Sequence, residues 1–323
     1  MFKYIMKRLG LMIMTFTIII VGSFLLIKLV PIVVSPAMGK DAELQEAIIV
    51  ARGYRDPLFK QLVTWIGRIF DGDFGVGVTM NGYIGHKVWD TFTDKLPMTI
   101  VFNVYSSVFA VPIGLLLGIY AALRKNKWQD HVISTGVMVL ISVPSYVTAF
   151  LLQYFLCVWI ANLGLTTFPL TVLDGTAPLF SWPMFRSMIP AILAMSLGSI
   201  AGYCRFTRAE LTEVLTGDYL LLARTKGLTK RQSIFRHALR NAMVPIFPAI
   251  IGEFLSVLSG SLILEQIFSI NGVGKLYLLS INTLDYDFFM TLSGFYTLIG
   301  LAATIVIDIS YGFIDPRIKM GAK

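Results

Sequence analysis

The chain has 323 residues, of which 56% are hydrophobic and only 14% are charged, and it carries a net charge of +8. Soluble globular proteins are usually about 45–50% apolar and about 25% charged, so this composition excludes a disordered chain and argues against a soluble enzyme. Its mean hydropathy of +0.74 is typical of a protein whose apolar surface faces lipid. The two cysteines, Cys157 and Cys204, lie in apolar runs and indicate neither a disulfide framework nor a zinc site.

Six apolar runs are long enough to cross a bilayer as helices, which takes about 20 residues. We therefore predict an all-α integral membrane protein with six transmembrane helices. The predicted spans are Leu9–Val30, Met98–Leu123, Val132–Ile160, Ile189–Tyr203, Ala242–Leu264 and Phe288–Ile314. The fourth run is short, and the polar stretch after it is consistent with the same helix leaving the membrane.

Most of the 27 basic residues fall in four segments that six spans would place on one side of the membrane. These segments are the N-terminal tail, the loop after the second span, residues 205–240 and the C-terminus. Short cytoplasmic loops carry an excess of Lys and Arg, so we predict that both termini are cytoplasmic. The positive net charge then reflects topology and needs no nucleic-acid partner.

The segment between the first two spans is the largest on the outer side. Its charges nearly balance, and helical patterns cover Ala42–Ala51 and Pro57–Phe70, followed by a glycine-rich turn at Asp71–Gly75. The expected organisation is a tail and first helix over 1–30, an extracytoplasmic segment over 31–96, a membrane core over 97–314 and a cytoplasmic tail over 315–323.

Two G-x-x-x-G patterns occur inside spans, at Gly114 and Gly118 and at Gly198 and Gly202. Small residues at this spacing allow two helix backbones to approach closely. We expect ordinary packing within the chain, and contact with another subunit is the alternative.

Polar side chains inside a span are costly and are therefore candidates for a functional role. Glu253 lies in the fifth span with Ser256 and Ser259 at helical spacings beyond it, and Gln153 lies in the third span. One interpretation is that these four residues line a translocation path. The other is that Glu253 makes a hydrogen bond between packed helices.

The cytoplasmic segment 217–248 has the pattern of two short helices joined at a glycine. Asp218 can cap a first helix that Gly227 ends, and Thr229 with Gln232 forms a capping-box pattern for a second helix. The apolar residues of the second helix fall on one face with basic residues around it, and they are Ile234, Phe235, Ala238 and Leu239. A helix lying on the membrane surface is the rival interpretation.

This segment resembles the EAA loop of ABC importer permeases, and more narrowly the permeases of oligopeptide, dipeptide and nickel importers. The matching stretches are Ala223–Leu228, which reads ARTKGL, and Arg236–Ala242, which reads RHALRNA, with Pro245 after them. Three further motifs agree with that family: GDFG at Gly72–Gly75, EQIFSINGVG at Glu265–Gly274 and DPR at Asp315–Arg317. Asn271 replaces the usual proline, and Leu221 and Leu222 replace the glutamate and first alanine of the broad EAA motif.

The resemblance covers nearly the whole chain and implies the type I ABC importer permease fold. It implies that the cytoplasmic helices, in a coupling loop at about residues 210–241, dock into a groove on an ATPase. The residues expected to couple the two are Asp218, Ala223, Arg224, Lys226, Gly227, His237, Leu239, Arg240 and Asn241. The implied partners are a homologous second permease, two ATPase subunits that bind ATP and Mg²⁺, and an external substrate-binding protein.

No catalytic motif is present in the sequence. Gly272–Lys275 looks like part of a phosphate loop, but Leu276 follows the lysine and Ser269 replaces the first glycine, so ATP hydrolysis is expected in other subunits. The histidines are far apart in sequence, and we expect no metal site or cofactor in this chain. We therefore predict a permease subunit for peptides in the bacterial cytoplasmic membrane. The alternatives are nickel or another small solute as cargo, or an ion-coupled secondary carrier.

Overall fold

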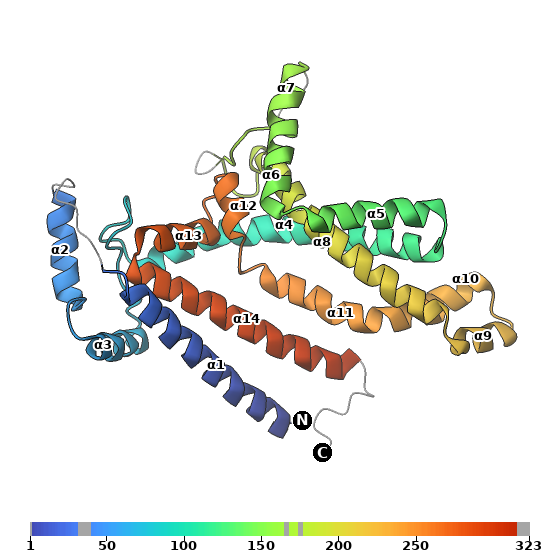
Figure 1. The fold of residues 1–323 in the computed structure, drawn as a ribbon, viewed down its shortest axis with the longest axis horizontal. Helices are drawn as coiled ribbons and strands as arrows, with labels where there is room; N and C mark the ends of the chain where they lie inside the picture. Colours follow the sequence, from blue (N-terminus) through green and yellow to red (C-terminus); the bar gives the residue numbers. More distant parts are fainter. Residues whose placement is uncertain (1, 32–39, 165–167, 174–176, 315–323) are drawn as a thin grey trace. The chain divides into compact units, whose positions relative to one another are not determined.

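The computed structural model describes residues 2–31, 40–164, 168–173 and 177–314 (Figure 1). These residues are almost entirely helical, and among them only two isolated bridges and no strands occur. The longer helices are α1 (Phe2–Lys28), α4 (Val88–Leu123), α5 (Trp128–Ser142), α8 (Trp182–Leu215), α11 (Leu239–Ser256) and α14 (Tyr286–Ile314). The shorter ones are α2 (Lys40–Arg52), α3 (Leu58–Phe70), α6 (Ser145–Gln153), α7 (Ile160–Asn162), α9 (Asp218–Thr225), α10 (Lys230–Ser233), α12 (Leu262–Ile267) and α13 (Val273–Thr283).

Six helical segments in the described part of the chain are long and apolar enough to cross a membrane, which confirms the predicted number. They are Met6–Lys28, Val88–Leu123, Ser145–Asn162, Trp182–Leu215, Lys230–Ser256 and Tyr286–Gly312. The fourth is a single helix of 34 residues, so the polar stretch after the fourth apolar run does continue that helix. The protein is thus a multi-pass, all-helical membrane protein.

The predicted third span, Val132–Ile160, is wrong as one helix. α5 ends at Ser142 and α6 begins at Ser145, because Val143 adopts an extended conformation before Pro144. A residue before proline is disfavoured in the helical region, and proline cannot donate the backbone hydrogen bond that a continuing helix requires. The third membrane candidate therefore consists of α6, the π-helix η2 (Tyr154–Trp159) and α7.

The predicted fifth span, Ala242–Leu264, begins too late and ends too late. α11 begins at Leu239 and ends at Ser256, after which the chain turns through Gly260 at a φ of +65° and enters α12. Ser259 therefore lies beyond the helix that carries Glu253 and Ser256. The expectation that all three share one helical face is wrong for Ser259.

The chain divides into two compact units. The first contains residues 1–99, 258–266 and 271–302, so it holds α1, α2, α3, α12, α13, the start of α4 and most of α14. The helices predicted at Ala42–Ala51 and Pro57–Phe70 are confirmed as α2 and α3. A buried cluster around Met80, Phe92 and Phe288 packs the outer segment on α13 and α14. The unit therefore joins the segment after the first span to the start of the sixth.

The second unit contains residues 100–257, 267–270 and 303–323. Here α8 packs against α5, α6 and α11. A Cβ on Gly114 would lie 2.7 Å from Tyr203, and one on Gly118 would lie 2.7 Å from the Cys204 carbonyl oxygen. This pair of glycines therefore packs α4 on α8 within the chain, as expected.

The second G-x-x-x-G pattern behaves differently. Nothing lies within 4 Å of a Cβ built on Gly198 or Gly202, so these glycines have no close-packed neighbour among the described residues of this chain. The two glycines on α8 therefore have room for close contact with another subunit. The DPR motif at Asp315–Arg317 and the C-terminal tail lie outside the described residues.

Candidate functional site: the coupling segment

The first helix of the coupling segment, which we define as residues 217–241, is α9. Gly217 is its N-cap and Asp218 its first residue, so Asp218 lies in the first turn and does not cap the helix as predicted. At the other end, the Gly227 N–H donates to the Arg224 carbonyl (2.9 Å) and the Leu228 N–H to that of Ala223 (3.3 Å). Gly227 has a φ of +92°, which confirms the predicted glycine stop.

The second helix begins at the predicted capping box. The backbone N–H of Gln232 donates to the Thr229 hydroxyl (3.3 Å), and that of Thr229 donates to the Gln232 side chain (2.9 Å). α10 then continues through the π-helix η3 (Ile234–Ala238) into α11 without a break. The segment is therefore a short helical hairpin whose second arm is the beginning of the fifth span (Figure 1).

An apolar cluster fixes this hairpin to the ends of two membrane helices. Leu220 of α9 and Ala238 and Ala242 of the second arm are buried against Ala122 of α4 and Leu211 of α8. Ala223 and Ile234 are also buried, and Ser233 is fully buried with its hydroxyl donated to the Thr229 carbonyl (3.1 Å). The hairpin therefore packs directly on the ends of α4 and α8.

The other face of the hairpin is open and unusually apolar. Leu221 and Leu222 are 60% and 57% exposed, Phe235 is 60% exposed and Tyr219 is 40% exposed. Phe235 was predicted to share one helical face with Ile234 and Ala238, but it is exposed whereas those two residues are buried. We call these four residues, with the exposed basic residues Arg224, Lys226, Arg236 and Arg240, the coupling surface.

The residues predicted to couple to an ATPase divide between the two faces. Exposed are Asp218, Arg224, Lys226, Gly227, His237, Arg240 and Asn241, whereas Ala223 is buried and Leu239 is half-buried. Ala223 and Leu239 therefore pack against other parts of this chain and do not face a partner. Leu221, Leu222 and Phe235 were absent from the predicted set, and their signal in the sequence was three large apolar residues among basic ones.

An ion pair next to the hairpin was not predicted. Asp130 near the start of α5 is 1% exposed and accepts from both Nε and Nη2 of Arg208 on α8, the latter at 2.8 Å. It also accepts the Asn126 backbone N–H (3.0 Å) and the Ser134 hydroxyl (3.3 Å). The Arg208 hydrogen bond, which outweighs the effect of burial, lowers the pKa of Asp130 to about 2. The pair thus joins α5 to α8 across the physiological pH range.

The residues predicted to line a translocation path are each engaged differently. The Ser199 hydroxyl donates to Glu253 Oε1 (2.9 Å), and the Ser256 hydroxyl donates to the Glu253 carbonyl (2.7 Å). The Gln153 amide donates to the Leu170 carbonyl (2.7 Å), so it ties α6 to the following loop. Glu253 is only half-buried, which distinguishes it from the fully buried carboxylates described next.

The EQIFSINGVG stretch is built around one buried carboxylate. Glu265 is fully buried, and its Oε1 accepts the Thr99 hydroxyl (3.1 Å) while Oε2 accepts the Lys275 N–H (2.9 Å). Thr99 Oγ1 in turn accepts the Val273 N–H (2.8 Å). Burial, opposed by these hydrogen bonds, raises the pKa of Glu265 to about 7.

The glycines of that stretch are explained by the same carboxylate. A Cβ on Gly272 would overlap Glu265 Oε2 and Thr99 Oγ1, and one on Gly274 would lie 2.9 Å from Oε2. Gly260 approaches the other oxygen, since its Cβ would lie 2.6 Å from Oε1. The motif therefore specifies a tightly wrapped loop around the Glu265 carboxylate.

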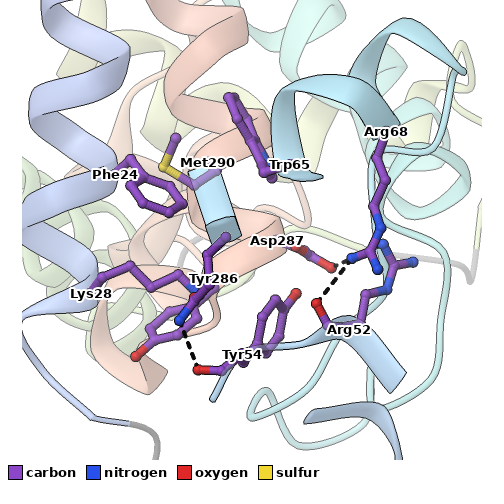
Figure 2. Close-up of a pocket in the computed structure, with 10 residues that line it drawn as sticks. Phe24, Lys28, Arg52, Tyr54, Trp65, Arg68, Tyr286, Asp287 and Met290 are labelled. Carbon is purple, nitrogen blue, oxygen red and sulfur yellow. Dashed lines mark hydrogen bonds and ion pairs between the residues drawn. The ribbon is translucent and has the colours of Figure 1, made fainter. Parts of the chain in front are cut away.

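Two more buried carboxylates fix the GDFG turn. Asp285 Oδ2 accepts the backbone N–H groups of Val78 (2.6 Å) and Thr79 (2.9 Å), and burial raises the Asp285 pKa. Asp287 accepts the Val76 N–H (3.1 Å) and lies 3.7 Å from Arg52 (Figure 2). A side chain on Gly75 would overlap Asp287.

Lys28 at the end of α1 enters the same region (Figure 2). Its Nζ lies 3.5 Å from the centre of the Tyr286 ring and 4.0 Å from that of Tyr54, which is a cation–π arrangement. Burial, together with the nearby Asp287 charge, raises the pKa of the Tyr54 hydroxyl. The lysine therefore anchors α1 to the outer segment. Neither contact was predicted, since Tyr54 and Tyr286 lie 26 and 258 positions from Lys28 and no local pattern links them to it.

Comparison with known proteins places the chain in a single group. Residues 114–320 match the family described as binding-protein-dependent transport system inner membrane components. The dipeptide transport system permease protein DppB of Bacillus subtilis is 32% identical over 331 residues, which covers 100% of both chains. The DppB protein of Lactococcus lactis is 30% identical over 99% of this chain and all of its own. The glutathione transport system permease protein GsiC of Salmonella choleraesuis is 29% identical over 99% of both.

Two solved structures share the fold. An amino acid ABC transporter crystallised with histidines gives a TM-score of 0.50 at 18% identity, covering 68% of this chain and 92% of that one. The MetNI methionine ABC transporter in an inward-facing conformation gives a TM-score of 0.50 at 16% identity, covering 69% and 97%. The type I importer permease fold expected from the sequence therefore fits the chain.

Proposed function

Because the chain belongs to the family of binding-protein-dependent transport system inner membrane components, within its peptide ABC importer permeases, we propose that it forms one membrane subunit of an ATP-driven peptide importer. In this assembly the chain carries the cargo path, and separate subunits bind ATP and Mg²⁺ and hydrolyse the nucleotide. The chain itself is not an enzyme and needs no cofactor of its own.

The observation that carries this proposal is the coupling surface. Leu221 and Leu222, between the fourth and fifth spans, and Phe235, at the beginning of the fifth, are more than half exposed. Their burial against a partner would be favourable by roughly 1.5–3 kcal/mol for each side chain. The basic residues around them complement an acidic or polar rim. Clustered, exposed apolar side chains with a polar rim are typical of a protein interface.

The opposite face of the hairpin supports a mechanical role. α9 and α10 are locked by a glycine-dependent stop, a capping box and the cluster around Leu220 and Ala238. A locked helix pair moves as a rigid body, so closure of an ATPase pair would be passed to α4 and α8. A helix lying along the membrane surface would need neither this packing nor the two-helix hairpin.

The expected complex contains a homologous second permease, two ATPase subunits and an external binding protein. The unpacked glycines Gly198 and Gly202 on α8 support a close contact with that second permease. The distribution of basic residues supports cytoplasmic termini, which places the coupling segment on the ATPase side. Peptides are the proposed cargo because the full-length relatives carry dipeptide and glutathione names.

The test is peptide uptake and ATPase co-purification in a Leu222→Asp variant of the complete complex. Burying a carboxylate at an apolar interface is costly, so we expect uptake at background and loss of the ATPase subunits, with normal amounts of this chain in the membrane. Leu44→Asp is the matched control, since Leu44 is an exposed leucine of α2 outside the spans. Normal uptake and assembly in Leu222→Asp would contradict the proposal.

A further inference from the structure

A large apolar groove lies on the first unit, and no part of the proposed transport mechanism uses it. It encloses about 700 Å³, within the range of about 300–1,000 Å³ that ligand pockets occupy. Its walls come from α1, α3 and α14, and Phe74, Trp89 and Phe92 complete it. The wall residues that matter below are Thr17 of α1, Trp65 and Phe70 of α3, and Thr291, Gly294 and Phe295 of α14.

The groove offers little to a polar occupant. Its two hydroxyl groups are already used, because Thr17 donates to the Ile13 carbonyl (2.8 Å) and Thr291 donates to the Phe74 carbonyl (3.1 Å). The remaining lining residues are aliphatic and aromatic side chains and one glycine, and only the indole N–H groups of Trp65 and Trp89 are polar. A peptide placed here would leave its backbone N–H and C=O groups without partners, at a cost of several kcal/mol each in a lipid environment. Water has no anchor here either.

The third wall, α3, has the character of a helix that lies at a membrane surface. Its sequence contains two basic residues, Lys60 and Arg68, and no acidic residue. Lys60 pairs with Asp56 just before the helix (3.0 Å) and stays largely exposed, and Arg68 donates to the Arg52 carbonyl (3.3 Å). None of its residues is buried, and Phe59 and Phe70 are 79% and 87% exposed. Aromatic and aliphatic residues on one side with Lys and Arg on the other are typical of helices at the headgroup boundary.

The size of the groove argues against a membrane helix as its occupant. A helix with side chains is about 10–12 Å wide, so a single turn fills on the order of 500 Å³. The groove would therefore hold little more than one turn of such a helix. A flexible hydrocarbon chain can follow a narrow apolar channel, and two of the walls are membrane-spanning helices.

We propose that this groove binds one acyl chain of a membrane phospholipid, with the phosphate at the level of α3, the wall that carries Lys60 and Arg68. The bound lipid fills the space between α1 and α14 and completes the packing that α3 provides from the side. The proposal depends only on the membrane location of the chain and not on the transported substrate or the ATPase.

The experiment uses the full-length chain in vesicles of phosphatidylethanolamine and phosphatidylglycerol that contain a phospholipid with a diazirine on its acyl chain. After illumination, adducts are mapped by peptide mass spectrometry. We expect adducts concentrated on Trp65, Phe70 and Phe295, well above those on Leu26, which is exposed on α1 outside the groove. Equal labelling of groove and freely exposed residues would overturn the proposal.

Two filling variants sharpen the test. Gly294→Phe extends a ring into the groove from α14, and only Ile20, at 3.7 Å, contacts its Cβ. Gly300→Phe makes the same change on the same helix outside the groove and serves as the control. Thr17→Trp fills the groove from α1 and guards against misfolding of the first variant. Both filling variants should reduce groove labelling to the level of Leu26, whereas the control should retain it.

The remaining candidate occupant is a helix of the second permease. It is tested with a photoreactive benzoylphenylalanine at Phe70 in the assembled complex in native membranes. An adduct of lipid mass supports the proposal. A cross-link to another protein chain, with the diazirine labelling absent, would show that the groove is a subunit interface.

Discussion

The coupling segment and the loop around Glu265 both follow family motifs, yet they use their side chains in opposite ways. The coupling segment presents Leu222 and Phe235 outward and keeps only small or apolar residues inside. The second loop turns Glu265 inward, surrounds it with three glycines and satisfies both carboxylate oxygens. A motif can therefore specify either a surface for a partner or the architecture that holds the chain together, and burial distinguishes the two.

Within the coupling segment, we expect the largest effect on transport from a substitution at Gly227. The φ of +92° is strained for a non-glycine residue by about 1 kcal/mol or more, and an added charge would also obstruct docking of the coupling surface. No atom lies within 4 Å of a Cβ at this position, so the fold of the chain itself has room for a side chain. We expect Gly227→Asp to leave the chain in the membrane at near-normal levels and to abolish peptide uptake.

Gly227→Asn separates strain from charge, because asparagine tolerates positive φ better than most residues. It should retain a measurable part of the uptake. Uptake and ATPase co-purification are measured together in both variants. Wild-type uptake by Gly227→Asp, with a complete complex, would show that the segment is only a charged anchor.

In the loop around Glu265, a single added methyl group should destabilise the fold without altering any surface that contacts a partner. In Gly272→Ala the new methyl overlaps both Glu265 and Thr99, so the hydrogen bonds to the carboxylate must rearrange inside the fold. Overpacking together with a disrupted buried network costs on the order of 3–5 kcal/mol. We expect a large fall in the thermal unfolding temperature of the purified chain and low levels in the membrane.

Gly136→Ala is the control for that variant, because nothing lies within 4 Å of a Cβ on Gly136. Its unfolding temperature should stay close to that of the wild type. A stable Gly272→Ala chain would mean that the loop can relax around the methyl group and that the glycine is needed for something else.

Much of the coupling segment was predictable because its determinants are local. The capping box at Thr229 and Gln232 and the glycine stop at Gly227 depend on residues three or four positions apart, and the number of spans depends on continuous apolar runs. The break in the third span also had a local signal at Pro144. Its effect on the preceding residue outweighed the apolar run that continues on both sides.

The carboxylate contacts were not predictable for the converse reason. Asp285 accepts from Val78, and Thr99 donates to Glu265, across 207 and 166 positions of the chain. Nothing in the local sequence shows which distant backbone group will meet a carboxylate. The nearest available signal was the repetition of glycine near acidic residues, at Gly75 and Gly272, which indicates a close approach without naming the partner.

The buried Glu265 also predicts how stability depends on pH. Its pKa is raised from 4.5 to about 7 in the folded chain, so the folded state holds its proton over a range in which the unfolded state has released it. The stabilising effect is complete below about pH 4.5 and is lost as the pH rises through about 7, with a total on the order of 3 kcal/mol.

The measurement is the unfolding temperature of the purified chain between pH 4.5 and 8, compared with that of Glu265→Gln. The variant cannot titrate at this position, so its curve should be flatter across the window while lying lower overall, since one amide N–H group must face backbone donors. Parallel curves for the two proteins would assign the pH dependence to other groups.

The same substitution at Glu253 should have the smallest effect on stability. Glu253 is half-buried, and Ser199 donates to one of its two oxygens (2.9 Å), a bond that a glutamine carbonyl can still accept. Losing the charged character of one hydrogen bond costs about 1 kcal/mol or less when water reaches the group. We therefore expect Glu253→Gln to unfold within a few degrees of the wild type.

If this carboxylate lines the cargo path, uptake should change several-fold between cationic and anionic peptides, because a unit charge at about 4 Å contributes about 1–4 kcal/mol between water and a protein surface. Uptake is compared across a peptide panel in Glu253→Gln, with Ser199→Ala as the control that removes the hydrogen bond and keeps the charge. An unchanged ranking of peptides in Glu253→Gln would assign Glu253 to helix packing, and the pair of Glu→Gln variants would then differ only in how much stability each one loses.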